Sequence, residues 1–492
     1  MTKQKLVLFC LLFIFIIGCY LRLTGALSNS FAFTYDVGRD MLTLSQIISQ
    51  HKLLLIGPTT GLPGVFYGPW WYYFLLPAFF LSSGNPQGVA LFLGLVGCVT
   101  ILAGYFLGKK IGGTLFGVIF GIFLSISPVL IAWSSQIWNP NIAPIFVLAV
   151  FYTLQTIRSS KNKSFIPFFI LGLLLSLILD IEIVFGLLFC IGTVLAVVVL
   201  LKRFLSFKSI CSFILGFLLI LSPRIFFDAR HQFLMTKSLF TLFTKGAGSE
   251  TFNLIHQAQQ SWNMLFSLWN YTFANNLLAG ILVLIFSLTS FFFVRKHLAK
   301  TSQFFLVYCN IVISVFFIGL SFFKHDLFTH YVVGLPVVYI FIVTILCYEI
   351  LKETTGKIYI TALIAIIACV AISPIQLAAS FSRPLWIGDA SVYRNQLQVV
   401  TYIYKEAHGR QFKINVYTPP VFDYSYQYLF HWYGQKTYHY QPLQQTHLAF
   451  FILEPDLQYP FRLQNWLTVR KHDGLIIKTK QFPSGIIVQT RI

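Results

Sequence analysis

Repeated apolar runs of about 20 residues constrain this chain more than any other feature, because a helix of that length crosses the hydrocarbon core of a bilayer. Since 57% of the 492 residues are hydrophobic and only 10% are charged, no soluble core could bury them. The sequence therefore predicts an α-helical polytopic membrane protein with about eleven transmembrane helices. The predicted spans are 5–25, 87–107, 112–132, 141–157, 165–182, 183–201, 209–227, 275–294, 302–323, 329–350 and 357–377.

Positive charge sets the predicted orientation. Basic clusters occur in every second connection, as the positive-inside rule requires. The N-terminus is therefore expected in the cytoplasm and the C-terminal domain outside it. The net charge of +20 is divided among these clusters instead of forming one stripe, so nucleic-acid binding is not expected. We expect the plasma membrane, since the sequence carries no organelle address.

Acidic residues gather on the predicted outer side. Of the nine that precede residue 380, only Glu349 and Glu353 lie on the inner side. Carboxylates at a membrane boundary are costly and tend to be functional, so any chemistry is expected on the outer face. The outer acids are Asp36, Asp40, Asp180, Glu182, Asp228, Glu250 and Asp326.

The first outer loop, residues 27–86, is long enough to hold structure of its own. Apolar residues of 37–48 share one helical face and Asp36, Arg39 and Asp40 share the other, which predicts an amphipathic interfacial helix. In the simplest interpretation this helix is structural, with Arg39 paired to its neighbouring acids. The aromatic cluster after Pro69 predicts a second short interfacial helix.

The composition changes after residue 378, so we divide the chain into a transmembrane module, 1–378, and a small extracytoplasmic α/β domain, 379–492. Strands are predicted over 414–420, 448–453 and 485–489, and a helix over 424–433. Scaffolding is the simpler role for this domain, although its aromatic residues could bind an acceptor glycan.

Several motifs follow one another at matching topological positions over roughly residues 1–380. They are Asp36 with Arg39, the Pro69-aromatic stretch, Trp138-Asn139-Pro140, Phe227-Asp228-Ala229-Arg230-His231 and His330-Tyr331. In this order they resemble the GT-C superfamily of membrane glycosyltransferases. The resemblance is closest to glycosyltransferase family 39, the protein O-mannosyltransferases and lipid A aminoarabinose transferases. It implies the GT-C fold.

Three positions depart from that family's pattern. Val37 stands where a second acid is common, Gly68 where some members have lysine, and Gln136 where an arginine often contacts the lipid phosphate. Neutralisation of the phosphate is therefore expected from other residues.

The resemblance implies a polyprenyl-phosphate-linked sugar donor and a hydroxyl acceptor on a protein, lipid or glycan, with inversion at the anomeric carbon. Asp36 is then the predicted catalytic base. Asp40, Arg39, Tyr67 and Asn139 are predicted to hold the acceptor or support the base. For Asp40 a helix-face ion pair is the alternative. For Asn139 the alternative is a cap on the helix opened by Pro140.

Cations near the outer ends of spans are the candidates for the lipid phosphate, namely Arg224, Arg230, His231, His325 and His330. The two arginines could instead snorkel to the headgroups. No cofactor is certain. If the reaction uses a divalent metal, Asp36, Asp40 and His325 are the predicted ligands, although their spacing matches no metal signature.

Two other functions stay open at this point. A transporter or flippase of a lipid-linked or small polar substrate would usually show paired repeats and charges at the midplane. This sequence shows neither, because its charges gather at span ends. A catalytically inactive scaffold is the other alternative, which the three departures keep open.

Overall fold

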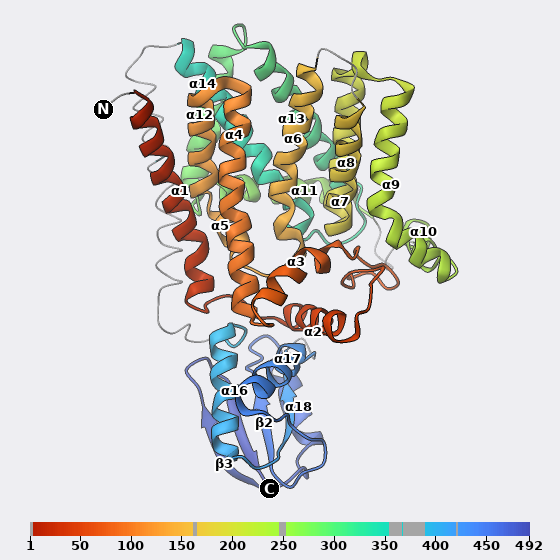
Figure 1. Cartoon of the computed structure of the whole chain (residues 1–492), viewed down its shortest axis with the longest axis vertical. Coiled ribbons are helices and arrows are strands. Elements are labelled where there is room, and N and C mark those ends of the chain that lie inside the picture. The colour runs from red at the N-terminus through yellow and green to blue at the C-terminus, as the bar shows by residue number, and fades with distance from the viewer. Residues whose placement is uncertain (1–2, 161–164, 246–251, 354–366, 368–388, 420–421) are drawn as a thin grey trace.

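The structure is a computed structural model that describes residues 3–160, 165–245, 252–353, 367, 389–419 and 422–492. A helical bundle carries a small α/β domain under one end (Figure 1). We call this end of the bundle the domain-facing end. Apart from residue 367, the predicted span 357–377 and the predicted boundary after 378 lie outside the described residues.

Apolar helices build the bundle, as predicted, and the chain is a multi-pass membrane protein. Seven segments of the described chain are long and apolar enough to cross a membrane, and α1 and α7 contain shorter apolar stretches. The bundle helices are α1 (Lys3–Leu27), α4 (Pro86–Ile126), α6 (Ala143–Ser159), α7 (Ile166–Ile181), α8 (Ile183–Leu200), α9 (Phe207–Arg230), α12 (Leu277–Val294), α13 (Lys300–Ser321) and α14 (Leu335–Glu353).

The predicted second and third spans, 87–107 and 112–132, are the two halves of α4. The chain turns between them at Gly113, whose φ of 81° is open to glycine at no steric cost. The halves then approach closely, since a Cβ on Gly108 would lie 2.8 Å from the Cα of Gly117. The prediction for the third span was wrong at its end, because α4 stops at Ile126 before Pro128.

Shorter helices fill the connections. The two predicted helices of the first loop are confirmed as α2 (Tyr35–Gln50) and α3 (Trp70–Leu81). Both lie between the bundle and the α/β domain (Figure 1). Helices α10 and α11 were not predicted, because both lie in the connection between the predicted spans 209–227 and 275–294. The other short elements are α5 (Pro128–Ser134), η1 (Asn139–Ile142), η2 (Lys202–Phe204), α10 (Leu234–Lys245), α11 (Leu254–Phe273) and η3 (Thr329–Val332).

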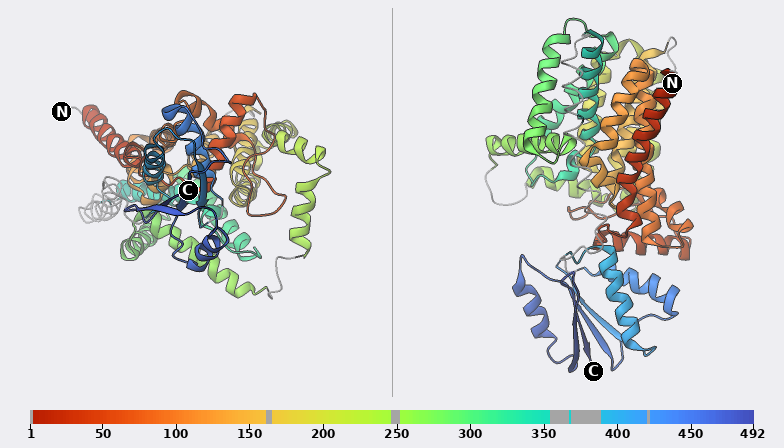
Figure 2. Two further views of the ribbon diagram at one scale, coloured as in Figure 1. Left: turned by 90° about the horizontal axis from the view of Figure 1, so that it is seen from below. Right: turned by 90° about the vertical axis from the view of Figure 1, so that its left-hand side faces the viewer.

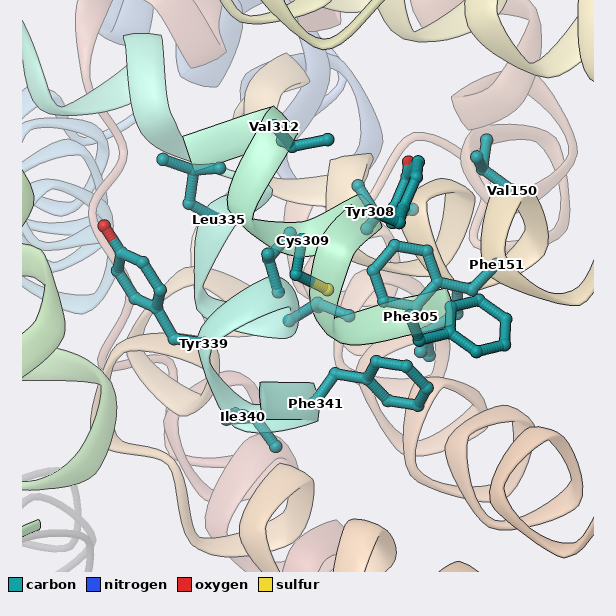
Figure 3. Packing of buried hydrophobic residues seen from close by; sticks show 14 of the residues in the cluster. Val150, Phe151, Phe305, Tyr308, Cys309, Val312, Leu335, Tyr339, Ile340 and Phe341 are labelled. Carbon is teal, nitrogen blue, oxygen red and sulfur yellow. The ribbon is translucent and has the colours of Figure 1, made fainter. Parts of the chain in front are cut away.

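Aromatic rings pack at the centre of the bundle, where α6, α13 and α14 meet (Figure 3). The ring of Phe151 lies 5.4 Å from that of Tyr308 and 4.9 Å from that of Phe341. Tyr308 is fully buried, and its hydroxyl lies 3.0 Å from that of Thr193. This packing fixes the helices whose ends frame the site.

The α/β domain holds a four-stranded sheet in the order β1-β2-β4-β3, in which only β1 and β2 are parallel. The three predicted strands are found. We missed β3, whose residues are all exposed and show no apolar alternation. The elements are α16 (Tyr393–Ala407), β1 (Lys413–Tyr417), α17 (Tyr424–Leu429), the π-helix η4 (Phe430–Tyr438), β2 (Ala449–Leu453), α18 (Pro460–Val469), β3 (Ile476–Gln481) and β4 (Ile487–Arg491).

The domain packs directly on the first loop, and the right-hand view of Figure 2 shows it under the bundle from a second side. The N–H of Phe33 donates to the carbonyl of Ser391 at 2.7 Å, and that of Tyr393 donates to the carbonyl of Phe31 at 3.0 Å. Helix α17 lies so close to α2 that a Cβ on Gly38 would be 2.3 Å from a backbone nitrogen. One buried apolar cluster includes residues of both parts.

Candidate active site

The N-terminal turn of α2 presents the three charged residues that the sequence singles out. Arg39 pairs with both acids, at 2.7 Å from Asp36 and 2.8 Å from Asp40. The side chain of Asp36 is 31% exposed and that of Asp40 only 3% exposed. The ion pair expected of a structural helix is therefore present, but the two carboxylates face different surroundings.

Asp40 is held inside the protein. The indole N–H of Trp71 donates to Oδ2 of Asp40 at 2.8 Å, and the hydroxyl of Tyr72 donates to its Oδ1 at 3.3 Å. Burial raises the pKa of Asp40, while Arg39 opposes that rise. These contacts join α2 to α3, and the helix-face ion pair that we kept as the alternative for Asp40 is present in its contact with Arg39.

Asp36 lines a cavity of about 530 Å³ between the bundle and the α/β domain. The wall on the bundle side comes from the start of α2 and from the segment Gln136–Trp138. Thr418, Phe422 and Glu454 contribute to the wall on the domain side. A partly exposed carboxylate at the edge of such a cavity can accept a proton from a bound hydroxyl group.

A second group of buried polar residues ties the first loop to the turn between α7 and α8. The hydroxyl of Tyr67 donates to Glu182 at 2.8 Å, and Asn139 donates to the carbonyl of Ile181 at 2.5 Å. Burial raises the pKa of Glu182 to about 8. The alternative of a helix cap was wrong for Asn139, because no side-chain cap forms at the following helices and its amide joins two connections.

Asp180 and Arg224 form an ion pair in the same region, between α7 and α9. Nε of Arg224 lies 3.0 Å from Oδ1 of Asp180, although the atoms are not aligned for a hydrogen bond. A Cβ on Gly68 would lie 1.6 Å from this same oxygen. The departure at position 68 is thereby explained, since no lysine side chain has room beside Asp180.

The other two departures also have a structural setting. Val37 is buried in the apolar cluster beneath α2, where a second carboxylate would lack partners. Gln136 is exposed and lines the cavity. The cavity wall therefore carries a neutral amide where an arginine is common in the family that the sequence resembles.

The remaining cation candidates fall in two places. Arg230 and His231 are exposed at the end of α9, where Nδ1 of His231 lies 2.7 Å from the carbonyl of Phe227. Phe227 packs on Phe66, 5.6 Å between rings, so the first loop reaches this helix end.

The two histidines lie near η3. The ring of His330 packs 5.1 Å from that of Trp138, a residue of the cavity wall. The carbonyl of His325 accepts from Gln257 of α11, an element absent from our predictions. Asp326 lines a second cavity of about 900 Å³, which is bounded by α5 and α11.

The expected metal ligands are not brought together. In the part of the chain that the structure describes, no group of three His, Cys, Asp or Glu side chains could hold a metal ion. Asp36 and Asp40 instead share the guanidinium of Arg39. His325 belongs to the separate group near α11.

Several residues of the site were not predicted. Gln396 and Glu454, which reach the cavity from the α/β domain, had no predicted role. Glu182 was expected on the outer side, but its contact with Tyr67, 115 positions away, was not predicted. Trp138 did carry a signal, since its Trp-Asn-Pro motif marks the wall of the cavity.

The sequence matches no protein-family model and no curated protein. The fold, however, is similar to that of ArnT from Cupriavidus metallidurans. The crystal structure bound to undecaprenyl phosphate gives a TM-score of 0.60 and the apo structure 0.59, each at 9% identity. Both comparisons cover 99% of this chain and 98% of ArnT. The chain has the GT-C fold. The match extends over the bundle and the α/β domain, so both parts that frame the cavity belong to the shared fold.

Proposed function

We propose that this GT-C protein is a membrane glycosyltransferase. It transfers a sugar from a polyprenyl-phosphate donor to a hydroxyl group, with Asp36 as the base. One observation carries the proposal. Asp36 is the partly exposed carboxylate of the α2 turn, and it borders a cavity at the end of a bundle with the fold of ArnT. ArnT itself has been crystallised with undecaprenyl phosphate.

The reaction needs a base and a held leaving group. The acceptor oxygen attacks the anomeric carbon while the carbon–oxygen bond to phosphate breaks. The phosphate departs with the bonding electrons, and Asp36 takes the hydroxyl proton. Attack opposite the phosphate inverts the anomeric centre. Arg39 holds Asp36 in position through the 2.7 Å ion pair.

The phosphate would be held by cations at the domain-facing end. Arg230 and His231 are exposed at the end of α9 and suit this role. Arg224 could bind the phosphate only if its ion pair with Asp180 were broken. His325 and His330 stay candidates near η3. A divalent metal is not part of the proposal, since no described group of ligands supports one.

The proposal includes an orientation in the plasma membrane. Basic clusters in alternate connections favour a cytoplasmic N-terminus and an extracytoplasmic α/β domain. Protease added to intact spheroplasts should then cut exposed sites in the domain, while connections with basic clusters stay protected. Cleavage of the domain only after lysis would reverse this orientation.

The decisive experiment compares wild type with Asp36→Asn, using a radiolabelled pool of polyprenyl-phosphate sugars and a membrane extract as acceptor. We expect the variant to lose at least about 100-fold in transfer rate, as removal of a general base does. Asp473→Asn, at an exposed site of the α/β domain, is the matched control and should transfer like wild type. If Asp36→Asn transfers sugar as fast as wild type, Asp36 is not the base and another acid has that role. No transfer, with labelled lipid crossing reconstituted bilayers, would favour a flippase.

A further inference from the structure

The cavity beside Asp36 has a wall of unusual charge. Three of its side chains carry carboxyl groups, namely Asp36, Asp389 and Glu454. None of the described lining residues is lysine, arginine or histidine. Arg39 forms an ion pair with Asp36 but does not line the cavity. Asp389 and Glu454 have no cationic partner in the described ion pairs. A phosphorylated acceptor would meet repulsion here.

A buried amide supplies independent evidence for a polar ligand. Gln396 lines the cavity and is 2% exposed. Its Nε2 donates to Glu454 at 3.2 Å, yet its Oε1 has no hydrogen-bond partner. A buried oxygen without a donor costs free energy, and a bound hydroxyl group would remove that cost. The wall therefore offers several acceptors, which suits a ligand rich in O–H donors.

Aromatic rings complete the wall. Tyr35, Trp138 and Phe422 all line the cavity, and the rings of Tyr35 and Phe422 lie 6.0 Å apart. Phe422 is 53% exposed, so its ring forms part of the rim. Flat apolar faces next to hydrogen-bond acceptors fit the pyranose ring, which has an apolar face and a hydroxylated edge.

We propose that this cavity is the acceptor subsite and that it takes an uncharged, hydroxyl-rich saccharide. The inference rests on the proposed function, because it assumes that Asp36 is the base. It adds the class of acceptor, which the proposed function leaves open. The volume of about 530 Å³ is within the range of small-ligand sites. Phe422 and Tyr35 hold the ring of the sugar, and Gln396 accepts one of its hydroxyl groups.

The first test measures binding without any donor. Purified full-length protein is dialysed against tritiated, uncharged manno-, gluco- and arabino-oligosaccharides, and against the same compounds with a phosphate ester. We expect at least one uncharged compound to bind, its phosphorylated form about tenfold more weakly, and Phe422→Ala to raise the dissociation constant about tenfold. Phe461→Ala, an equally exposed aromatic of α18 outside the cavity, is the control and should bind like wild type.

The outcomes separate the two proposals. Binding of no uncharged compound, preference for the phosphorylated forms, or equal binding by both phenylalanine variants would overturn the saccharide subsite. None of these results concerns Asp36. The proposed function fails only if transfer from the lipid donor is absent or insensitive to Asp36→Asn. In transfer assays, Phe422→Ala should raise the KM for the saccharide and leave the KM for the donor unchanged. If a peptide competes with the bound saccharide and accepts more label than the saccharide does, the acceptor is a peptide and the saccharide subsite is wrong.

Discussion

The indole N–H of Trp71 lies 2.8 Å from Oδ2 of Asp40 and donates to it. This contact gives the two acids of the α2 turn different roles. Asp40 faces α3 and is closed off by aromatic residues, while Asp36 faces the cavity one turn earlier. Two carboxylates that look equivalent on a helical wheel are therefore divided into a structural acid and a candidate catalytic acid.

Asp40→Asn should destabilise the protein more than Asp36→Asn. The buried carboxylate accepts from Trp71 and Arg39, and an amide would remove one of the two carboxylates that pair with the guanidinium of Arg39 and weaken the buried contacts with α3. We expect a loss of about 2–3 kcal/mol in unfolding free energy for Asp40→Asn and less than about 1 kcal/mol for Asp36→Asn. Thermal unfolding in detergent measures both. Equal melting temperatures would show that Asp40 does not join the two helices.

Gly38→Ala should loosen the α/β domain. The new methyl group would lie 2.3 Å from the backbone nitrogen of Ser425, so α2 and α17 must move apart. We expect a cost of about 1–3 kcal/mol, as overpacking usually gives. Hydrogen exchange at α17 should accelerate. Gly61→Ala is the matched control, since a Cβ at that position meets no atom within 4 Å. Unchanged exchange in Gly38→Ala would contradict the close packing.

Asp180 and Arg224 should behave as one unit in a double-mutant cycle. Their side chains are 0% and 8% exposed, so removing one charge leaves the other buried. We expect Arg224→Gln alone to cost about 3 kcal/mol or more, and the double variant with Asp180→Asn to cost less than the sum of the single changes. Arg230→Gln, at an exposed arginine of the same helix, should change stability by less than about 0.5 kcal/mol. Additive costs in the cycle would rule out the coupling.

Glu454 should make the α/β domain less stable as the pH rises. Burial raises the pKa of this carboxyl from 4.5 to about 7. The folded state therefore binds more protons than the unfolded state between these values, and the unfolding free energy falls as the pH increases through that window. The fall is on the order of 3 kcal/mol.

Glu454→Gln should remove most of that decline in denaturant unfolding at several pH values. Glu406→Gln is the control, because the side chain of Glu406 is 24% exposed and pairs with Lys478, which lowers its pKa. This variant should keep the decline of the wild type. If the unfolding free energy of Glu454→Gln still falls as the pH rises, another group causes the decline.

Local pattern was enough to predict much of this protein. Apolar runs located the spans, since each transmembrane helix must satisfy its own backbone hydrogen bonds within a fixed length. The period of about 3.6 residues located α2, because its buried face repeats along the helix. The motif that contains Asp36 was visible in the sequence because Asp36 and Arg39 lie within one helical turn.

The tertiary structure decided what distant residues do to one another. Tyr67 meets Glu182, and Gln396 meets Glu454, across 115 and 58 positions of the sequence. No local period encodes such contacts, because they depend on how the first loop and the α/β domain pack on the bundle. The sequence alone determined a polytopic helical protein with an acidic turn early in its first loop. Packing alone determined which acid is buried, which one faces the cavity, and which groups surround it.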